Sequence, residues 1–244
     1  MSRNNDLISV ICCYNDQEVF NKMLKKSILN QTQEAEIIDI DNRKRNYKSA
    51  ATALNYGASI AKGDYLIFAH QDIELFDDRF LEKVSKHFKE YGPSIIGIAG
   101  KEQQSKEVYS NITHGKDHVL AGKRTLNTPV VVSTLDEVLI ALPKKLFLKY
   151  KFDENTCYNW HLYVVDLCLT MAKDQIKSLV VPCEAYHKSD GVIDEIFVES
   201  VGRLIEKHRN DYDRILSTCL DLKTNPVSFQ LYKAGVKIYL LTRR

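Results

Sequence analysis

The sequence carries almost no excess of charge of either sign, and this restricts the partners that it can attract. Its 244 residues include 34 Lys and Arg against 32 Asp and Glu, which gives a formal net charge of +2. Such a chain has no overall field to attract a nucleic acid or an anionic membrane. Because 44% of its residues are apolar and 27% are charged, the composition also excludes an intrinsically disordered chain. We expect a globular protein that binds no nucleic acid.

Long apolar runs and paired cysteines are also missing. No run approaches the roughly 18 apolar residues that a membrane-spanning helix needs. The apolar stretch 7–13 has no small-residue cleavage site and ends at Asn15 and Asp16, which favours a strand over a signal peptide. The six cysteines form no CxxC pair and no disulfide-like spacing. These absences predict a cytoplasmic protein with reduced thiols and no transmembrane segment.

The sequence does contain an alternation of short apolar runs with helical patterns. We expect strands at 7–13, 36–40, 65–69 and 95–99, and helices at 17–29, 48–61 and 79–91. Asp16 is expected to cap the first helix, and Gly63 to end the second. The alternation predicts an α/β fold with a mostly parallel central sheet flanked by helices. Ligands bind such sheets beyond the carboxyl ends of the strands.

After Gly100 the pattern becomes mixed. Residues 101–129 are polar and show no sustained period. Further on we expect strands at 130–133, 138–142 and 178–182, helices at 143–150, 159–173, 194–209 and 211–220, a polar turn at 186–191, and an apolar C-terminal stretch at 227–241. No repeat or linker divides the chain. We therefore expect a single domain over 1–224, with halves 1–100 and 101–224, followed by a tail over 225–244.

The third strand ends in His70, Gln71 and Asp72. A carboxylate directly after a buried strand is well placed to hold Mg²⁺ or Mn²⁺, which prefer oxygen ligands and share their shell with substrate phosphates. Asp is also a common turn residue, so the alternative is that Asp72 only caps the turn that follows.

This segment resembles the signature of family 2 glycosyltransferases with the GT-A fold. The resemblance starts at Asn55 and Gly57 and continues through 61–72, where His70-Gln71-Asp72 stands in place of the family's DxD motif, an HQD form similar to that of a bacterial subgroup. Further similar segments follow the family's order, at 8–15, 36–42, 135–137, 152–154 and 160–168. An ordered set of this kind is more specific than any single motif.

The resemblance implies a metal-dependent, inverting transferase that moves a sugar from a nucleotide-diphosphate donor, most simply a UDP-sugar, to a glycan, lipid-linked or protein-linked acceptor. It makes 1–100 the nucleotide-binding half and 101–224 the acceptor half. The metal, Mn²⁺ or Mg²⁺, is assigned to Asp72 and His187, although a lone His is also common on a plain surface. The nucleotide is assigned to Cys13, Asn15, Asp39, Asp41, Asn55, His70 and Gln71. The acceptor side is assigned to Asp136, Glu137 and Trp160.

The position of the catalytic base departs from the family. There the base lies two residues before an Asp-Leu pair, and here that pair is Asp166-Leu167, so the position falls on Val164, which cannot accept a proton. Asp166 and His161 are the replacement candidates, because helical spacing brings them near one face. Asp166 could instead pair with a lysine such as Lys173. The alternative to an enzyme is a nucleotide-sugar-binding or interaction module of the same fold that has lost catalysis.

Two further features concern partners. Arg43, Lys44 and Arg45 form a basic cluster after the second strand, where they could meet a diphosphate or remain solvated. The tail is apolar with basic flanks. We expect it to pack onto the domain, with peripheral contact at the inner face of a membrane as the alternative. A nucleotidyltransferase is disfavoured, because no Gly-rich phosphate loop follows the first strand.

Overall fold

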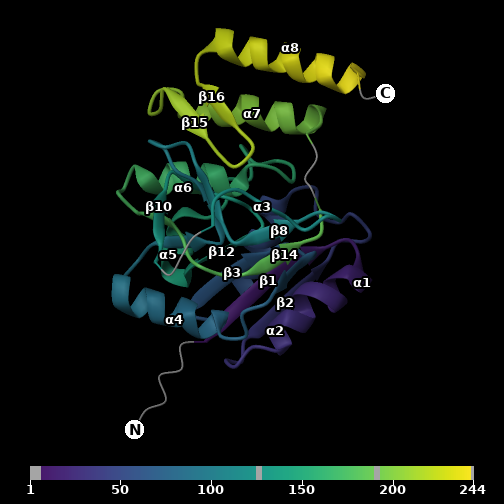
Figure 1. Ribbon diagram of the computed structural model, residues 1–244, viewed down its shortest axis with the longest axis vertical. Helices are drawn as coiled ribbons and strands as arrows, with labels where there is room; N and C mark the ends of the chain where they lie inside the picture. Colours follow the sequence, from purple (N-terminus) through teal and green to yellow (C-terminus); the bar gives the residue numbers. More distant parts are fainter. Residues whose placement is uncertain (1–6, 125–127, 190–192, 243–244) are drawn as a thin grey trace.

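The computed structural model describes residues 7–124, 128–189 and 193–242, and a seven-stranded sheet forms its centre (Figure 1). The strands, in spatial order, are β10 (Val130–Val132), β13 (Ser178–Val180), β5 (Ile95–Gly97), β12 (Leu139–Pro143), β3 (Tyr65–Ala69), β1 (Ile8–Tyr14) and β2 (Glu36–Asp41). Strand β1 runs parallel to β2 and β3, and β12 runs antiparallel to both β3 and β5. The expected α/β class with a mostly parallel sheet is confirmed.

Helices cover both faces of this sheet, because the central strands are apolar on both sides. In β3, Leu66 and Phe68 belong to a core cluster that includes residues of α3, α5 and α6, whereas Ile67 belongs to a cluster with residues of α1 and α4. The covering segments are α1 (Gln17–Phe20), the π-helical turn η1 (Asn21–Lys25), α2 (Lys26–Leu29), α3 (Ala50–Ile60), α4 (Phe80–Tyr91), α5 (Lys144–Tyr150) and α6 (Tyr163–Ala172). Alternation along each strand therefore builds two cores from one sheet.

The local signals at the helix ends are partly confirmed. The Asp16 carboxylate caps α1 by accepting from the backbone N–H groups of Glu18 and Val19, as expected. The expectation that Gly63 ends α3 is wrong, because the cap is Ala61. Gly63 instead lies against β1, where a Cβ atom would come within 2.6 Å of the Ser9 nitrogen. Only a glycine permits this close approach of two backbones.

The second half contains more strand than the sequence predicts. The run expected as one strand at 95–99 divides into β5 and β6 (Ala99–Lys101), which belong to different sheets. The aperiodic polar region contributes β7 (Val108–Ser110), β8 (Ile112–His114) and β9 (Val119–Leu120), and β11 (Thr134–Leu135) pairs with β6. Such short strands carry too few residues to show a period.

Two expectations near the C-terminus are wrong. The expected helix at 211–220 is a hairpin of β15 (Arg214–Leu216) and β16 (Asp221–Lys223); Ile215 and Leu220 are buried with residues of α7 (Glu195–His208), and this tertiary packing overrides the local helical pattern. The expected polar turn at 186–191 begins as a strand, β14 (Ala185–His187), which lies between β4 (Ile73–Leu75) and β8. Residues 190–192 lie outside the described residues.

Helices α7 and α8 (Pro226–Thr242) form a layer at the edge of the molecule (Figure 1). In the described part of the chain, no helix is both long and apolar enough to cross a membrane. The division into a domain over 1–224 and a tail over 225–244 stays a prediction; the described part of that tail is α8.

Candidate active site

A cleft of about 1020 Å³ lies at the carboxyl ends of β1, β2 and β3. This is the edge at which open α/β sheets bind ligands. Among the residues predicted for the site, those that line the cleft are Cys13, Asn15, His70, Gln71, Asp72 and Trp160. Its lining also carries the cations Arg43, Arg45 and Lys48. The cleft therefore combines acidic, imidazole and cationic groups.

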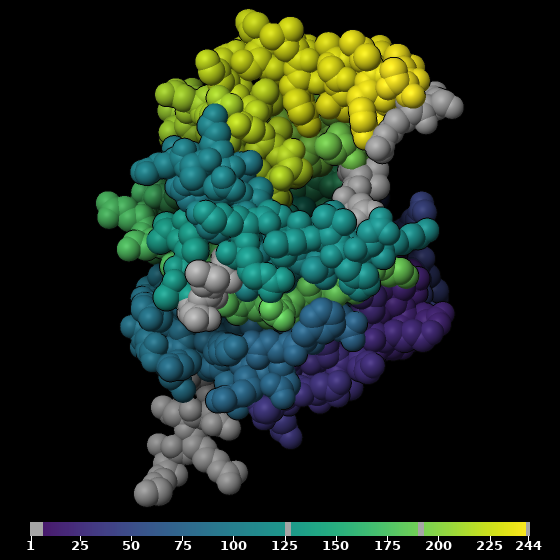
Figure 2. All heavy atoms as spheres, in the orientation of Figure 1, coloured from purple at the N-terminus to yellow at the C-terminus, as the bar shows by residue number. Residues whose placement is uncertain are grey.

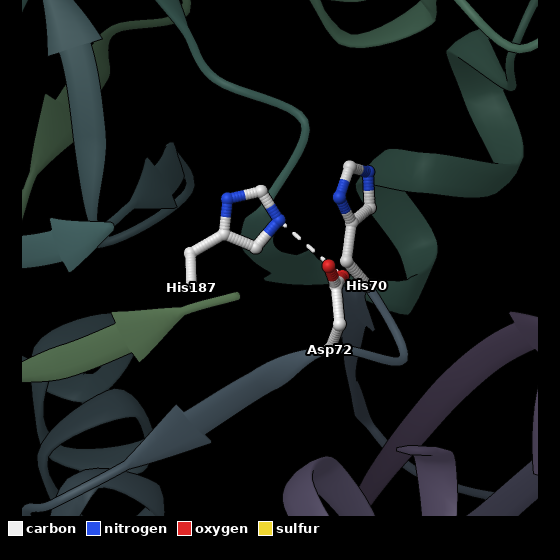
Figure 3. Close-up of side chains that lie close together, drawn as sticks. All are labelled: His70, Asp72 and His187. Carbon is white, nitrogen blue, oxygen red and sulfur yellow. Dashed lines mark ion pairs between the residues drawn. The ribbon is translucent and has the colours of Figure 1, made fainter. Parts of the chain in front are cut away.

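The predicted metal residues come together at this cleft (Figure 3). The Nε2 atom of His187 lies 3.3 Å from Oδ1 of Asp72. One ligand atom from each of His70, Asp72 and His187 lies within 4.8 Å of the other two. His70 and Asp72 come from the turn after β3, and His187 comes from the end of β14.

Strand pairing explains how a residue more than a hundred positions away reaches Asp72. Strand β14 runs antiparallel to β4 and pairs His187 with Ile73, the neighbour of Asp72. The backbone N–H of Lys188 also donates to the carbonyl oxygen of Asp72 at 3.0 Å. The hydroxyl groups of Ser189 and Tyr163 lie 3.1 Å from His187 Nε2 and 3.4 Å from His70 Nε2. The cluster is thus fixed by backbone register.

The charge states of the cluster suit a divalent cation. Burial alone would raise the pKa of Asp72, but the hydrogen bond and charge of His187 lower it well below its ordinary value. Burial, followed by the neighbouring His187, lowers the pKa of His70 and favours the neutral imidazole that binds metals. Metal–ligand bonds of about 2.0–2.2 Å place ligand atoms up to roughly 4.4 Å apart, so the observed separations fit with small side-chain adjustments.

Gln71 fixes the loop at the end of β1. Its Oε1 atom accepts from the backbone N–H groups of Asn15 and Asp16 at 2.9 and 3.0 Å. Its Nε2 atom donates to Oδ1 of Asn15 at 2.7 Å. Cys13 lies on the same strand end, where burial raises the pKa of its thiol to about 12. Gln71 therefore holds Asn15, one of the residues predicted for the nucleotide, directly after β1.

The exit of β2 turns its acidic groups away from the cleft lining. Asp41 is bound by the guanidinium of Arg43, at 2.6 Å from Nη2, and these hydrogen bonds lower the pKa of Asp41 to about 2. Asp39 is exposed and lies 3.7 Å from the Lys25 ammonium. Neither carboxylate lines the cleft, whereas Arg43 does. Asp41 is therefore joined to the cleft lining through Arg43.

Several cleft residues were not predicted. Asn42 is buried and exchanges hydrogen bonds with the backbone of Tyr47 at 2.9 and 3.1 Å, which shapes the loop after β2. Lys48 and Tyr163 also line the cleft. Asn42 lies two residues after the end of the predicted second strand, so its position at a strand exit was the available signal.

Asn55 is not brought to the cleft. Its Nδ2 atom donates to the carbonyl oxygen of Phe152 at 2.9 Å and to Glu154 at 2.8 Å, and its Oδ1 atom accepts from the Phe152 N–H at 3.1 Å. Both ends of the amide are used to hold the loop after α5. The amide therefore joins α3 to the loop after α5, and the nucleotide role of Asn55 stays a prediction.

The two candidate bases lie in different surroundings. The Asp166 carboxylate is buried and accepts hydrogen bonds from Lys207 and His208, both at 2.8 Å. It is therefore withdrawn from the cleft and bound by Lys207 and His208 in place of the expected lysine. His161 is partly exposed, with Nε2 4.0 Å from Asp194. Burial, partly opposed by Asp194, lowers the pKa of His161.

The start of α6 explains this separation. Leu162 takes a left-handed conformation with φ of 64°, so the helix begins at Tyr163 and not at the expected residue 159. His161 consequently precedes the helix, whereas Asp166 lies inside it. Val164 is fully buried in the core. Helical spacing thus does not bring the two candidate bases to one site.

The predicted acceptor-side residues also lie in different surroundings. Trp160 lines the cleft and is 41% exposed. Asp136 accepts from the Val138 N–H at 3.0 Å and from the Thr218 hydroxyl, which ties it to the hairpin. Burial and then Asp136 raise the pKa of Glu137, against the effect of the backbone N–H groups at the start of α6. Of the three residues, Trp160 is the one that lines the cleft.

Comparison with solved structures defines the fold. The chain is similar to GalNAc-T7 crystallised with UDP, GalNAc and Mn²⁺, with a TM-score of 0.60 at 13% identity over 84% of this chain and 48% of that chain. It is also similar to residues 1–349 of S. aureus TarS in complex with UDP-GlcNAc, with a TM-score of 0.56 at 16% identity over 84% of this chain and 68% of that chain. The chain has the GT-A glycosyltransferase fold, and it spans about half the length of GalNAc-T7.

The sequence comparison assigns the family. Residues 9–199 match the model of the glycosyltransferase-like family, and the chain belongs to this family. A curated relative from Fuscovulum blasticum, described as ATP synthase subunits region ORF 6, is 23% identical over 222 residues, covering 88% of each chain. The expected GT-A fold and relation to family 2 glycosyltransferases are confirmed.

Proposed function

We propose that this protein transfers a sugar from a nucleotide-diphosphate donor to a hydroxyl acceptor, with a divalent cation held by His70, Asp72 and His187. The observation that carries this proposal is the convergence of three ligand atoms within 4.8 Å at the cleft. The cleft volume of about 1020 Å³ lies at the upper end of the range found for small-molecule sites, which suits a nucleotide with an attached sugar.

The side chains around the cluster have separable tasks. A bound cation supplies Lewis-acid neutralisation of the leaving diphosphate. Two imidazoles and one carboxylate favour Mn²⁺ over Mg²⁺, since Mg²⁺ prefers oxygen ligands alone. Arg43, Arg45 and Lys48 contribute cations to the same lining and can bind phosphate oxygens. The loop that Gln71 fixes holds the β1 end in a single position, which lowers the entropy lost when the donor is bound.

His161 is the base that we favour for an inverting transfer. It follows Trp160, which lines the cleft and offers an aromatic face to a sugar ring. The lowered pKa of His161 keeps its imidazole neutral near neutral pH, as a proton acceptor requires. Asp166 is less suited, because Lys207 and His208 already bind its carboxylate.

The structural neighbours support the donor class. GalNAc-T7 was crystallised with UDP, GalNAc and Mn²⁺, and TarS with UDP-GlcNAc. A UDP-sugar is therefore the first donor to test here, with carbohydrate, glycolipid and glycoprotein acceptors in the panel.

A melting experiment tests the donor and the metal together. UDP with Mn²⁺ should raise the melting temperature of the protein, and EDTA should remove the effect, because a ligand that binds only the folded state stabilises it. Asp72→Asn should abolish the shift, whereas Asp64→Asn, at an exposed position directly before the opposite end of β3, is the matched control that should retain it. The absence of any shift with UDP or GDP and either cation contradicts the proposal.

A second candidate function is a nucleotide-sugar-binding module without catalysis, which the buried Val164 at the family's base position favours. His161→Gln distinguishes the two. For an enzyme this variant should keep the shift with UDP and Mn²⁺ but lose roughly 10²–10⁴-fold in transfer rate, the usual contribution of a general base. Donor binding without transfer or hydrolysis by the unmodified chain would identify the module.

A further inference from the structure

Helix α8 is apolar on two opposite sides. On its inner side, Phe229 and Tyr232 pack against the core that contains residues of α7. The approach is close, since a Cβ atom on Gly202 of α7 would lie 2.8 Å from the Phe229 ring. The inner contact fixes the orientation of the helix and thereby determines which residues face outward.

The outer side carries an uncovered apolar stripe. Val227, Leu231, Ile238 and Leu241 are 69%, 70%, 63% and 61% exposed. Together with the exposed Ala234, they follow each other at intervals of four, three, four and three residues, which places them on one face of a helix. The space-filling view shows α8, in yellow, at the outer edge of the molecule (Figure 2). We call these five residues the outer stripe.

The charges of α8 are all of one sign. The helix contains Lys233 and Lys237 and no Asp or Glu. The sequence continues with Arg243 and Arg244. The chain as a whole is nearly neutral, so this end concentrates positive charge beside an apolar surface.

This charge pattern discriminates between the surfaces that could cover the outer stripe. Helix pairs at heptad spacing usually place opposite charges beside the apolar seam. A second copy of α8 would supply only further lysines. An anionic lipid surface matches both features, because its acyl boundary buries apolar side chains and its headgroups attract Lys and Arg.

We propose that α8 docks this protein on an anionic lipid membrane, lying in the plane of the interface with the outer stripe directed into the lipid. Its 17 residues span roughly 25 Å at the usual helical rise. The inner contacts with α7 keep the helix attached to the domain while the outer stripe is buried. The proposal stands apart from the proposed transfer reaction, since it requires neither donor nor metal.

Co-sedimentation of the full-length chain with vesicles tests the proposal. The protein should pellet with equimolar phosphatidylcholine and phosphatidylglycerol, and should remain in solution with phosphatidylcholine alone. Lys233→Gln with Lys237→Gln should weaken binding roughly 30-fold, since each lysine near an anionic surface contributes roughly a factor of five. Leu231→Ser with Ile238→Ser should also release the protein, since it removes apolar area from the outer stripe.

Matched variants separate a specific face from general charge. Lys62→Gln with Lys145→Gln removes the same charge from exposed positions elsewhere and should leave vesicle binding unchanged. Every variant should keep the melting temperature of the parent, since all these side chains are exposed. Equal binding by the stripe variant and the parent overturns the proposal. The proposal is also overturned if light scattering shows that the parent is a dimer and that Leu231→Ser with Ile238→Ser is a monomer. A second copy of the chain would then cover the outer stripe.

Discussion

Two Asp–His pairs in this molecule have similar contacts and different surroundings. Asp72 and His187 meet at 3.3 Å, with side chains 15% and 17% exposed. Asp166 and His208 meet at 2.8 Å, with side chains 2% and 0% exposed. The first pair lies at the cleft, with Asp72 directly before β4 and His187 at the end of β14, and the second is buried between α6 and α7.

The residue next to each Asp–His pair, His70 in the first and Lys207 in the second, determines whether the carboxylate is available to a metal. His70 adds a nitrogen ligand to the first pair, so the cluster offers three ligand atoms for a metal and includes no Lys or Arg side chain. Lys207 adds an ammonium to the second pair at 2.8 Å, so the Asp166 carboxylate is already neutralised. We therefore expect an Asp–His contact to bind a metal only where no ammonium group already pairs with the carboxylate and where solvent or substrate can enter. The second pair instead joins two helices.

The largest expected effect is on stability, at the buried pair. Asp166→Ala leaves the fully buried His208 without its carboxylate, while Lys207 keeps Asp153, and removing one partner of a buried pair typically costs about 3–5 kcal/mol. Urea unfolding should show this loss in the free energy of unfolding. Asp72→Asn should lower the free energy of unfolding by less than Asp166→Ala does, because the pair at the cleft is partly solvated.

The same variant can break the comparison. If Asp166→Ala folds with undiminished stability and loses transfer activity, then Asp166 serves the reaction and the distinction between the two pairs fails.

The histidines should differ in metal dependence. His187→Gln should raise the Mn²⁺ concentration needed for half-maximal thermal stabilisation by at least about tenfold, since even residues that only support metal ligands contribute factors of about 10–100. His208→Gln should leave that concentration unchanged. It should lower the free energy of unfolding by about 1.5–3 kcal/mol, the range for a hydrogen bond to a charged group. Titration of Mn²⁺ during thermal unfolding measures both, and an equal Mn²⁺ response in the two variants would refute the assignment of His187.

The first pair was largely predictable from the sequence and the second was not. The strand 65–69 and the acid after it form one local pattern, and the structure places β3 at the same residues. His187 was predicted through the family resemblance. Its partner strand was not, because the register of β14 on β4 depends on pairing between distant residues.

The hydrogen-bond partners of Asp166 could not be predicted from local sequence patterns. Its partners Lys207 and His208 lie 41 and 42 residues further along the chain, and no helical spacing predicts them. The expected lysine partner, Lys173, pairs with Asp211 instead. The prediction of a helix at 211–220 failed for the same reason, because the apolar residues of the β15–β16 hairpin are buried by contacts with α7, which is distant in the sequence.

The smallest expected effect on stability is at Asp153, the partly exposed carboxylate that also binds Lys207. Asp153 accepts from Lys207 at 2.9 Å and from the backbone N–H of Asn155 at 2.9 Å. Burial opposes ionisation, but the hydrogen bond from Lys207 lowers the pKa of Asp153 to about 2. Because this pKa is lower in the folded state, the stabilisation is present above the ordinary Asp pKa of about 3.9 and is lost as the pH falls towards 2.

Asp153→Asn should therefore lower the free energy of unfolding by about 1 kcal/mol at neutral pH, a value reduced for the partial exposure of the carboxylate. The difference from the parent should shrink as the pH falls below about 4, because both chains then lack the charge. Urea unfolding across this pH range measures it, with Asp117→Asn as an exposed control that should show no such convergence. A difference that persists at the acid end would mean that Asp153 acts through its hydrogen bonds to Asn155 and Thr156 rather than through its charge, and that Lys207 belongs to Asp166 alone.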